Sequence, residues 1–231
     1  MPKQIKKRIT KKVDTEVDVK DKLAAFKDTL KDRQKTLVIY GIVVLTIIIS
    51  ITAFFIFSFS LQRNAEQLAY DAYNIYYNEY QKSLVTEQVR YEKSLNIFKK
   101  AYETKKSPRT LLYIASCYYE IGKYDDALNT LEDFTERYSN KHTLIPLAYI
   151  KIAQVYQRKG SPQEALKTLD SLSHLKDDIY KDLAFMESGR ILEMEGRLEE
   201  AKEQYNEITT RFPNSPFLEE AKAKLSEKKE G

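Results

Sequence analysis

The sequence predicts an all-α protein in which a single transmembrane helix is followed by a solenoid of stacked helical hairpins and a C-terminal capping helix. Two observations lead to this fold class. A phrase made of Gly, four residues and Ala occurs three times at nearly constant spacing, and an uncharged run of 25 residues precedes all three copies. Repetition with a period of about 20–50 residues is typical of solenoids, whose repeats pack against their neighbours. The pattern favours binding over catalysis.

The repeated phrase is interpreted as the turn between the two helices of one hairpin. A Gly can adopt the left-handed conformation that closes a helix, and acidic residues after it suit the first turn of the next helix. In the second copy, Ser161 is the expected N-terminal cap and Pro162 the first helical residue. The small Ala allows two helices to cross closely. The alanines are 38 and 36 residues apart, and the three pairs are Gly122 and Ala127, Gly160 and Ala165, and Gly196 and Ala201.

Apolar residues spaced by three and four predict an amphipathic helix before each Gly and another after it. The helices before the phrase have apolar faces formed by Leu111, Ile114, Ala115 and Tyr118, by Tyr149, Ile152, Ala153 and Tyr156, and by Phe185, Met186, Gly189 and Leu192. The helices after it have Ala127, Leu128, Leu131 and Phe134, and then Ala165, Leu166, Leu169 and Leu172.

These hairpins resemble the tetratricopeptide repeat, a helix–turn–helix unit of 34 residues. The small residue of the family's first helix matches Ala115, Ala153 and Gly189, and its terminal proline is present as Pro213. The units here are two to four residues longer than 34, and the family's early Trp is absent. The resemblance places repeats at 108–145, 146–181 and 182–214.

A degenerate repeat is expected at 64–107 and a capping helix at 215–229. The first helix of the degenerate repeat is expected from Asn64 to about Val85. Ser94, 33 residues before Ala127, stands where the other repeats have the Ala of the repeated phrase. Ser215 and Pro216 open the capping helix, whose charged face suits the solvated end of a solenoid. No Gly lies between positions 41 and 122, so the membrane helix is expected to continue into the first repeat helix.

The uncharged run covers 37–61. At about 1.5 Å per residue it reaches about 37 Å, longer than the roughly 30 Å hydrocarbon core of a bilayer. The preceding tail, 1–36, carries 12 Lys or Arg and 6 Asp or Glu, whereas 62–231 carries 26 and 28. The positive-inside rule therefore predicts a cytoplasmic tail and an extracytoplasmic domain at 62–231. The basic balance belongs to the tail and does not predict nucleic-acid binding.

A cleaved signal peptide is the rival interpretation of the N-terminal region. The charged region and the apolar run are both too long for one, and no small-residue cleavage site follows, so an uncleaved anchor is favoured. Within the tail, Val19, Leu23, Phe26 and Leu30 are spaced for an amphipathic helix. That helix either contacts the anionic inner leaflet or a membrane partner, or is incidental in a solvated tail.

No residue pattern of catalysis, cofactor binding or metal binding is found. The only cysteine, Cys117, is expected to be a small buried side chain, and His142 and His174 are expected at the surface without ligand-spaced companions. Walker, dinucleotide and nucleophile-elbow motifs are absent, and no acidic pair stands out as a catalytic dyad. The sequence predicts a protein that is not an enzyme and has no cofactor.

The resemblance to tetratricopeptide repeats implies a protein-binding groove lined by one face of each first helix. An apolar groove of this kind suits extended hydrophobic polypeptide segments. The alternatives are that these residues pack against neighbouring helices or close a homo-oligomer interface. The positions are Arg109, Leu112, Ser116, Tyr119 and Glu120, then Leu147, Ile150, Gln154, Gln157 and Arg158, then Leu183, Met186, Arg190, Glu193 and Met194.

The complete plan resembles the bacterial family of ancillary subunits of the SecYEG translocon, which have one N-terminal membrane helix and a periplasmic tetratricopeptide domain. The basic segment from Lys7 to Lys12 looks like the start of such proteins. The resemblance implies location in the bacterial inner membrane, the lipid bilayer, SecYEG and periplasmic chaperones as partners, and assistance to translocating or newly exported proteins. The alternative is a scaffold of a cell-envelope complex, in cell-division coordination or outer-membrane assembly.

Overall fold

The structure is a computed structural model that describes residues 15–77 and 86–226. Its described part contains ten α-helices and no strand. Two compact units are distinguished, 1–59 and 60–231. The helices are α1 (Thr15–Asp32), α2 (Gln34–Tyr77), α3 (Glu87–Thr104), α4 (Pro108–Glu120), α5 (Tyr124–Arg137), α6 (Ile145–Arg158), α7 (Pro162–Ser173), α8 (Lys181–Met194), α9 (Leu198–Arg211) and α10 (Leu218–Ser226).

The first unit contains α1 and the apolar part of α2. Helix α1 lies where an amphipathic helix was predicted, and the side chains of Val19, Leu23 and Phe26 are all exposed. Helix α2 is long and apolar enough to cross a membrane, and none of its most apolar 18-residue stretch is buried. Two other kinds of helix are also long and apolar enough. One is the core helix of a soluble protein, which is mostly buried, and the other is an N-terminal signal sequence. The transmembrane assignment therefore stays a prediction.

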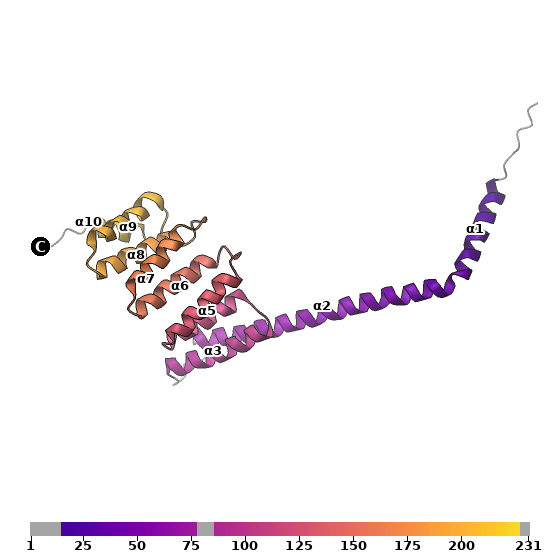
Figure 1. The fold of residues 1–231 in the computed structure, drawn as a ribbon, viewed down its shortest axis with the longest axis horizontal. Helices are drawn as coiled ribbons and strands as arrows, with labels where there is room; N and C mark the ends of the chain where they lie inside the picture. The colour runs from indigo at the N-terminus through magenta and orange to yellow at the C-terminus, as the bar shows by residue number, and fades with distance from the viewer. Residues whose placement is uncertain (1–14, 78–85, 227–231) are drawn as a thin grey trace, which may run out of the picture. The chain divides into compact units, whose positions relative to one another are not determined.

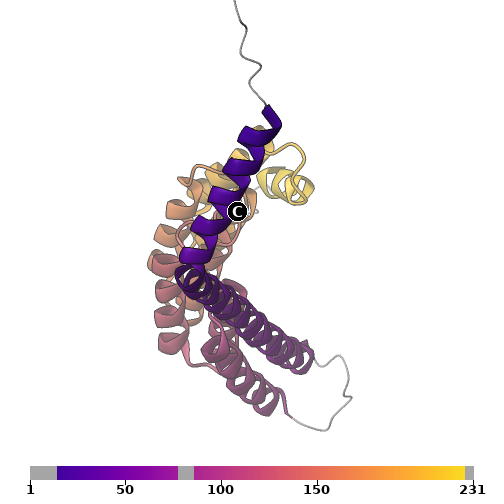
Figure 2. The same ribbon diagram turned by 90° about the vertical axis from the view of Figure 1, so that its right-hand side faces the viewer.

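The second unit is an all-helical solenoid, as predicted. Helices α3 to α10 lie beside one another in chain order, each packed on the next (Figure 1, Figure 2). Three clusters of buried residues follow one another along the stack. The first is centred on residues such as Phe98 and Phe134, the second on Leu169, and the third on Met186 and Tyr205. The core thus continues from repeat to repeat, as expected of a solenoid.

The three glycines of the repeated phrase close their helices in the same way. Gly122, Gly160 and Gly196 have φ angles of 76°, 70° and 74°. After α4, the Gly122 N–H donates to the Tyr119 carbonyl at 3.0 Å and the Lys123 N–H to the Tyr118 carbonyl at 2.9 Å. This pair of hydrogen bonds is the Schellman motif, and it recurs after α6 and α8. The predicted helix closure at the phrase is confirmed.

Substituting Gly160 by alanine is expected to destabilise the repeats by about 1–2 kcal/mol, the cost of a left-handed conformation for a residue with a Cβ atom. The measurement is urea unfolding followed by the near-ultraviolet signal of the tyrosines. Gly41→Ala is the matched control, because neither added Cβ meets an atom within 4 Å and only Gly160 has a positive φ. An equal effect of both substitutions would contradict this explanation.

Two details of the predicted elements are corrected. Ser161 occupies the N-cap position of α7, but its side chain makes no capping hydrogen bond, and its backbone N–H donates to the Tyr156 carbonyl at the end of α6. The capping helix α10 begins at Leu218 and not at Ser215, whose hydroxyl donates to Asp182 Oδ2 at 2.7 Å and accepts from the Phe217 N–H. Asn64, the expected start of the first repeat helix, lies inside α2, in agreement with the expected continuation of the apolar segment into this helix.

The degenerate repeat is formed by the last part of α2 together with α3. The apolar segment and the first repeat helix belong to one helix, α2, as the lack of Gly predicted, and the described part of this helix reaches Tyr77. Ser94 is fully buried, and its hydroxyl donates to the Ala72 carbonyl at 2.7 Å. This hydrogen bond satisfies a polar group at a position where the other repeats have Ala. The predicted extension of the first helix to Val85 and of the capping helix to 229 falls outside the described residues.

Candidate functional site

The groove positions predicted from the resemblance differ widely in exposure. Leu112, Ser116, Ile150 and Met186 are buried, with at most 7% of their surface exposed. These four side chains pack against neighbouring helices, which was the alternative to a groove. A side chain inside the core cannot touch a partner without rearrangement. Tyr119, Leu147, Gln157, Leu183, Arg190 and Glu193 are half-buried, and Arg109, Glu120, Gln154, Arg158 and Met194 are exposed. We call the side formed by these accessible residues of α4, α6 and α8 the A-helix surface.

Part of the A-helix surface is held together by contacts between α4 and α6. The Arg158 Nε donates to the Tyr119 hydroxyl at 2.9 Å, and the guanidinium lies 5.8 Å from the centre of the same ring. A small cavity of about 60 Å³ lies beside this contact and is lined by Ser116, Tyr119, Glu120, Lys151 and Gln154 among others. These predicted groove positions of α4 and α6 therefore lie beside one another, and the cavity between them is small.

The charges around this cavity are partly desolvated. Burial lowers the pKa of the Lys151 ammonium, while the Glu120 carboxylate acts in the opposite direction. The Tyr76 hydroxyl donates to Glu120 Oε1 at 3.4 Å, and burial together with Glu120 raises the pKa of Tyr76. A lysine, a carboxylate and a phenol thus share one side of the first repeats. Glu120 accepts a hydrogen bond from Tyr76 and acts on Lys151 through its charge.

Contacts with the capping helix occupy the other end of the A-helix surface. Arg190 Nη1 contacts Glu187 at 2.8 Å, and its Nη2 contacts Glu220 of α10 at 2.7 Å. Lys224 of α10 lies 3.1 Å from Glu193. The predicted groove residues Arg190 and Glu193 therefore hold α10 in place. Met194, which is 75% exposed, remains accessible beside them.

Cys117 and the histidines lie as the sequence predicted. Cys117 is fully buried, and burial raises the pKa of its thiol to about 12. His142 and His174 are both exposed. Among the described residues, no group of three or more His, Cys, Asp or Glu side chains is arranged to hold a metal ion. The described residues thus offer no cluster from which a metal centre can be built.

We expect Cys117 to react with a maleimide only when the protein unfolds. The thiolate is the nucleophile, and both the raised pKa and the buried position suppress it near pH 8. Labelling followed by mass spectrometry over a urea series should therefore follow the global unfolding curve. Rapid labelling of the native protein at pH 8 would contradict the buried position.

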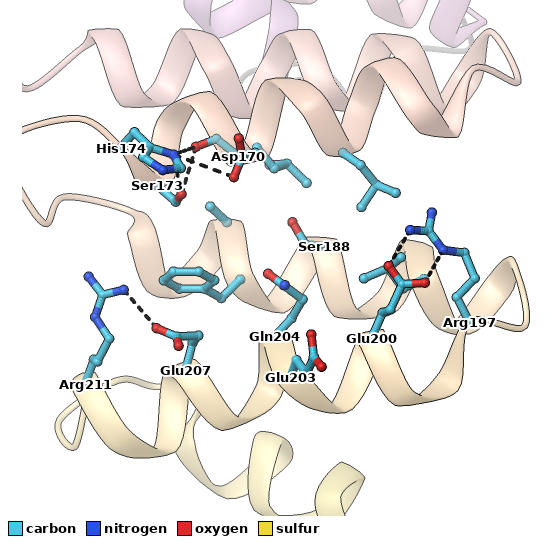
Figure 3. A pocket seen from close by; sticks show the side chains of 15 residues that line it. Asp170, Ser173, His174, Ser188, Arg197, Glu200, Glu203, Gln204, Glu207 and Arg211 are labelled. Atoms are coloured by element: carbon cyan, nitrogen blue, oxygen red, sulfur yellow. Dashed lines mark hydrogen bonds and ion pairs between the residues drawn. The ribbon is translucent and has the colours of Figure 1, made fainter.

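A second surface, formed by α7, α8 and α9, was not found by sequence reasoning. A cavity of about 590 Å³ between these helices has apolar lining residues that include Leu169, Phe185 and Leu192. Figure 3 labels the polar side chains around it. The walls of this cavity carry Asp170, Glu200, Glu203 and Glu207, and two of these are bound by arginines: Arg197 Nη2 lies 2.5 Å from Glu200 and Arg211 Nη1 lies 2.8 Å from Glu207.

The sequence signal for this second surface was a row of glutamates in α9, Glu200, Glu203 and Glu207, spaced by three and four residues. The same spacing is equally typical of a solvated helix face. His174 and Asp170 lie on the opposite wall, with the ring Nδ1 3.6 Å from Asp170 Oδ1 (Figure 3). The two Arg–Glu pairs neutralise half of the carboxylates, so the cavity offers a mixed polar wall above an apolar floor and no isolated acid–base pair.

The comparisons with known proteins identify the repeats. The tetratricopeptide repeat-like domain family matches residues 32–227. A heat shock protein sti1 homolog of Schizosaccharomyces pombe is 29% identical over a match that covers 52% of this chain and 25% of the relative. This chain thus matches about a quarter of that protein's length.

Two solved structures match the chain at low sequence identity, and the first of them shares its fold. A Podospora anserina putative kinesin light chain with nearly identical TPR-like repeats has a TM-score of 0.52 at 14% identity, covering 71% of this chain and 84% of its own. The MamA protein has a TM-score of 0.48 at 17% identity, covering 69% and 80%. The family match spans most of the sequence, including the repeats and the apolar segment, and the chain therefore belongs to the tetratricopeptide repeat-like domain family.

Proposed function

We propose that this chain is a membrane-anchored protein–protein interaction module that assists translocating or newly exported polypeptides near the Sec translocon. Membership of the tetratricopeptide repeat-like family supports the interaction role. The observation that carries the anchored role is the uncharged stretch of α2, which has no buried residue and continues directly into the first repeat helix. The basic tail supports an orientation with the N-terminus in the cytoplasm and the repeats in the periplasm.

The proposed mechanism is binding without catalysis or cofactor. The accessible part of the A-helix surface offers polar groups at Gln154 and Arg158 and an apolar group at Met194. An extended polypeptide can contact such a surface through its backbone and its apolar side chains. SecYEG and periplasmic chaperones are the proposed neighbours, and the bilayer is the proposed site of anchoring.

A second candidate function, a scaffold of a cell-envelope complex, is favoured by the contacts that narrow the A-helix surface. Tyr119 is held by Arg158, and Arg190 is held by Glu220. Fixed side chains of this kind match one partner of defined shape better than a series of unrelated clients. A second copy of this chain is one such partner.

Photocrosslinking in living cells tests the two functions. A photoreactive residue in place of Gln154, which is exposed and lines the cavity between α4 and α6, is expected to capture many different exported proteins. A photoreactive residue in place of Glu132, exposed on α5, is the matched control. One stoichiometric partner captured at Gln154 would support the scaffold. The same set of proteins at both positions would contradict binding by the A-helix surface.

A further inference from the structure

A third cavity lies in the degenerate repeat, between α2, α3 and the start of α4. Its volume is about 660 Å³, within the range of roughly 300–1,000 Å³ that is usual for small-molecule sites. The lining is mainly apolar and is contributed by Ala65, Ala69, Tyr70, Tyr73, Phe98 and Tyr113. All of these residues belong to the unit that begins at Ser60. The cavity is thus part of the repeat domain itself.

The rim of this cavity is basic. The short segment between α3 and α4 contributes Lys105 and Lys106, and the first turn of α4 contributes Arg109. Glu66 is the single carboxylate among the lining residues. Lys105 Nζ donates to Gln62 Oε1 at 2.8 Å, and Gln62 Nε2 donates to Glu66 Oε1 at 2.8 Å. Gln62 thereby separates the lysine from the carboxylate, and the lysine is not neutralised by an ion pair.

Lys106 and Arg109 complete the positive side of the rim. Lys106 Nζ lies 4.1 Å from the centre of the Tyr102 ring, and Arg109 is exposed at the start of α4. Among the residues whose side chains are described, neither cation forms an ion pair with a carboxylate. Three cations above an apolar, tyrosine-rich lining complement a molecule that has both an anionic group and a hydrocarbon part.

The position of the cavity in the chain indicates where such a molecule would come from. Gln62, the first lining residue, directly follows Leu61, the end of the uncharged run. At about 1.5 Å per residue, Ala65 lies about 6 Å along α2 from Leu61, and the headgroup layer of a bilayer is about 5–8 Å thick on each side. If the run spans the membrane, this end of the cavity lies at headgroup depth.

We propose that this cavity binds an anionic phospholipid of the membrane in which the chain is anchored. The phosphate lies against Lys106 and Arg109, and the upper part of an acyl chain lies against the tyrosines and Phe98. The proposal rests on the membrane anchor of the proposed function, and it goes beyond that function by assigning a ligand to a surface that the protein-binding role does not use.

The test uses the full chain reconstituted in phosphatidylcholine nanodiscs that contain a photoactivatable phosphatidylglycerol. Labelled peptides from 62–73 or 109–113 are quantified by mass spectrometry. A cation near an anionic headgroup strengthens binding about fivefold, so the double variant Lys106→Gln/Arg109→Gln is expected to lose labelling by about 30-fold. The matched control, Lys93→Gln/Lys100→Gln, removes two exposed charges from α3 that do not line the cavity and should stay within about twofold.

Several outcomes would overturn the proposal. Equal losses of labelling in both double variants would show that the lipid is attracted by the general positive charge of the surface and not by this cavity. Full competition by glycerol 3-phosphate would show a site for a free anion, and stronger labelling of the same residues by a photoreactive apolar peptide would show a peptide site. Ala69→Phe, which fills the cavity without changing charge, is a further variant that should also abolish labelling.

Failure of the anchor is distinguishable from failure of the lipid site. A chain without a membrane anchor would not co-purify with nanodiscs at all, whereas a chain without the lipid site would co-purify and remain unlabelled in the cavity. Unchanged circular dichroism of each variant confirms that a loss of labelling does not reflect unfolding.

Discussion

Replacing Phe134 by alanine is expected to lower the free energy of unfolding of the repeats by about 3–5 kcal/mol. Phe134 is fully buried in α5, within the cluster that joins the first repeats, and its ring lies 5.4 Å from the ring of Tyr138. Alanine would remove the ring and leave a cavity that helices on both sides cannot fill without moving. The measurement is urea unfolding of the full chain in detergent, followed by near-ultraviolet circular dichroism of the tyrosines.

The control for Phe134 is Asn129→Ala on the same helix. Asn129 is exposed, so its truncation should change the free energy of unfolding by less than about 0.5 kcal/mol. Because each repeat stabilises its neighbours, we expect the Phe134 variant to lose cooperativity along the solenoid as well as stability. A loss below about 1 kcal/mol would mean that α5 does not pack as described.

Replacing Gly189 by alanine is expected to destabilise the third repeat by about 1–3 kcal/mol, the usual cost of overpacking a core. An added Cβ would lie 2.4 Å from Cε1 and 2.6 Å from Cζ of Tyr205. The Tyr205 ring is 1% exposed and enclosed by its neighbours, so it has no free space to move into. The same unfolding measurement checks this variant.

The equivalent positions in the other repeats provide a rescue experiment for Gly189. In the second repeat the corresponding pair is Ala153 and Leu169. Ala153 is larger than Gly189, and Leu169 is smaller than Tyr205. The double variant Gly189→Ala/Tyr205→Leu should therefore be more stable than Gly189→Ala alone, with a coupling energy that a double-mutant cycle can measure. Additive effects of the two substitutions would contradict direct contact between these positions.

The hairpins and their turns were predictable because they depend on local patterns. Gly122 and its two counterparts require a positive φ, and residues such as Leu131 and Leu169 recur at helical spacing, so both signals are present in a single stretch of sequence. The pairing of Gly189 with Tyr205 was not predictable, because it is a matter of distance between two helices. The sequence indicates only that one residue is small and another large.

The candidate site was predictable only in part. The resemblance to a family indicates which helix of each repeat carries the groove positions, and two of these positions, Tyr119 and Arg158, are in contact in the structure. It did not predict that Met186 is buried or that Glu220 engages Arg190, since both depend on how far each hairpin rotates against the next. The cavity formed by α7, α8 and α9 was not predictable, because carboxylates spaced along a helix are also typical of a solvated face.

Protease accessibility in spheroplasts tests most directly the proposal that one uncleaved helix anchors the repeats outside the cytoplasm. The protein carries one epitope before residue 1 and another after residue 231. We expect protease added to intact spheroplasts to remove the C-terminal epitope, while the N-terminal epitope stays on a membrane-bound fragment until the cells are lysed. Survival of the C-terminal epitope in intact spheroplasts, or its release from the membrane without protease, would contradict the account.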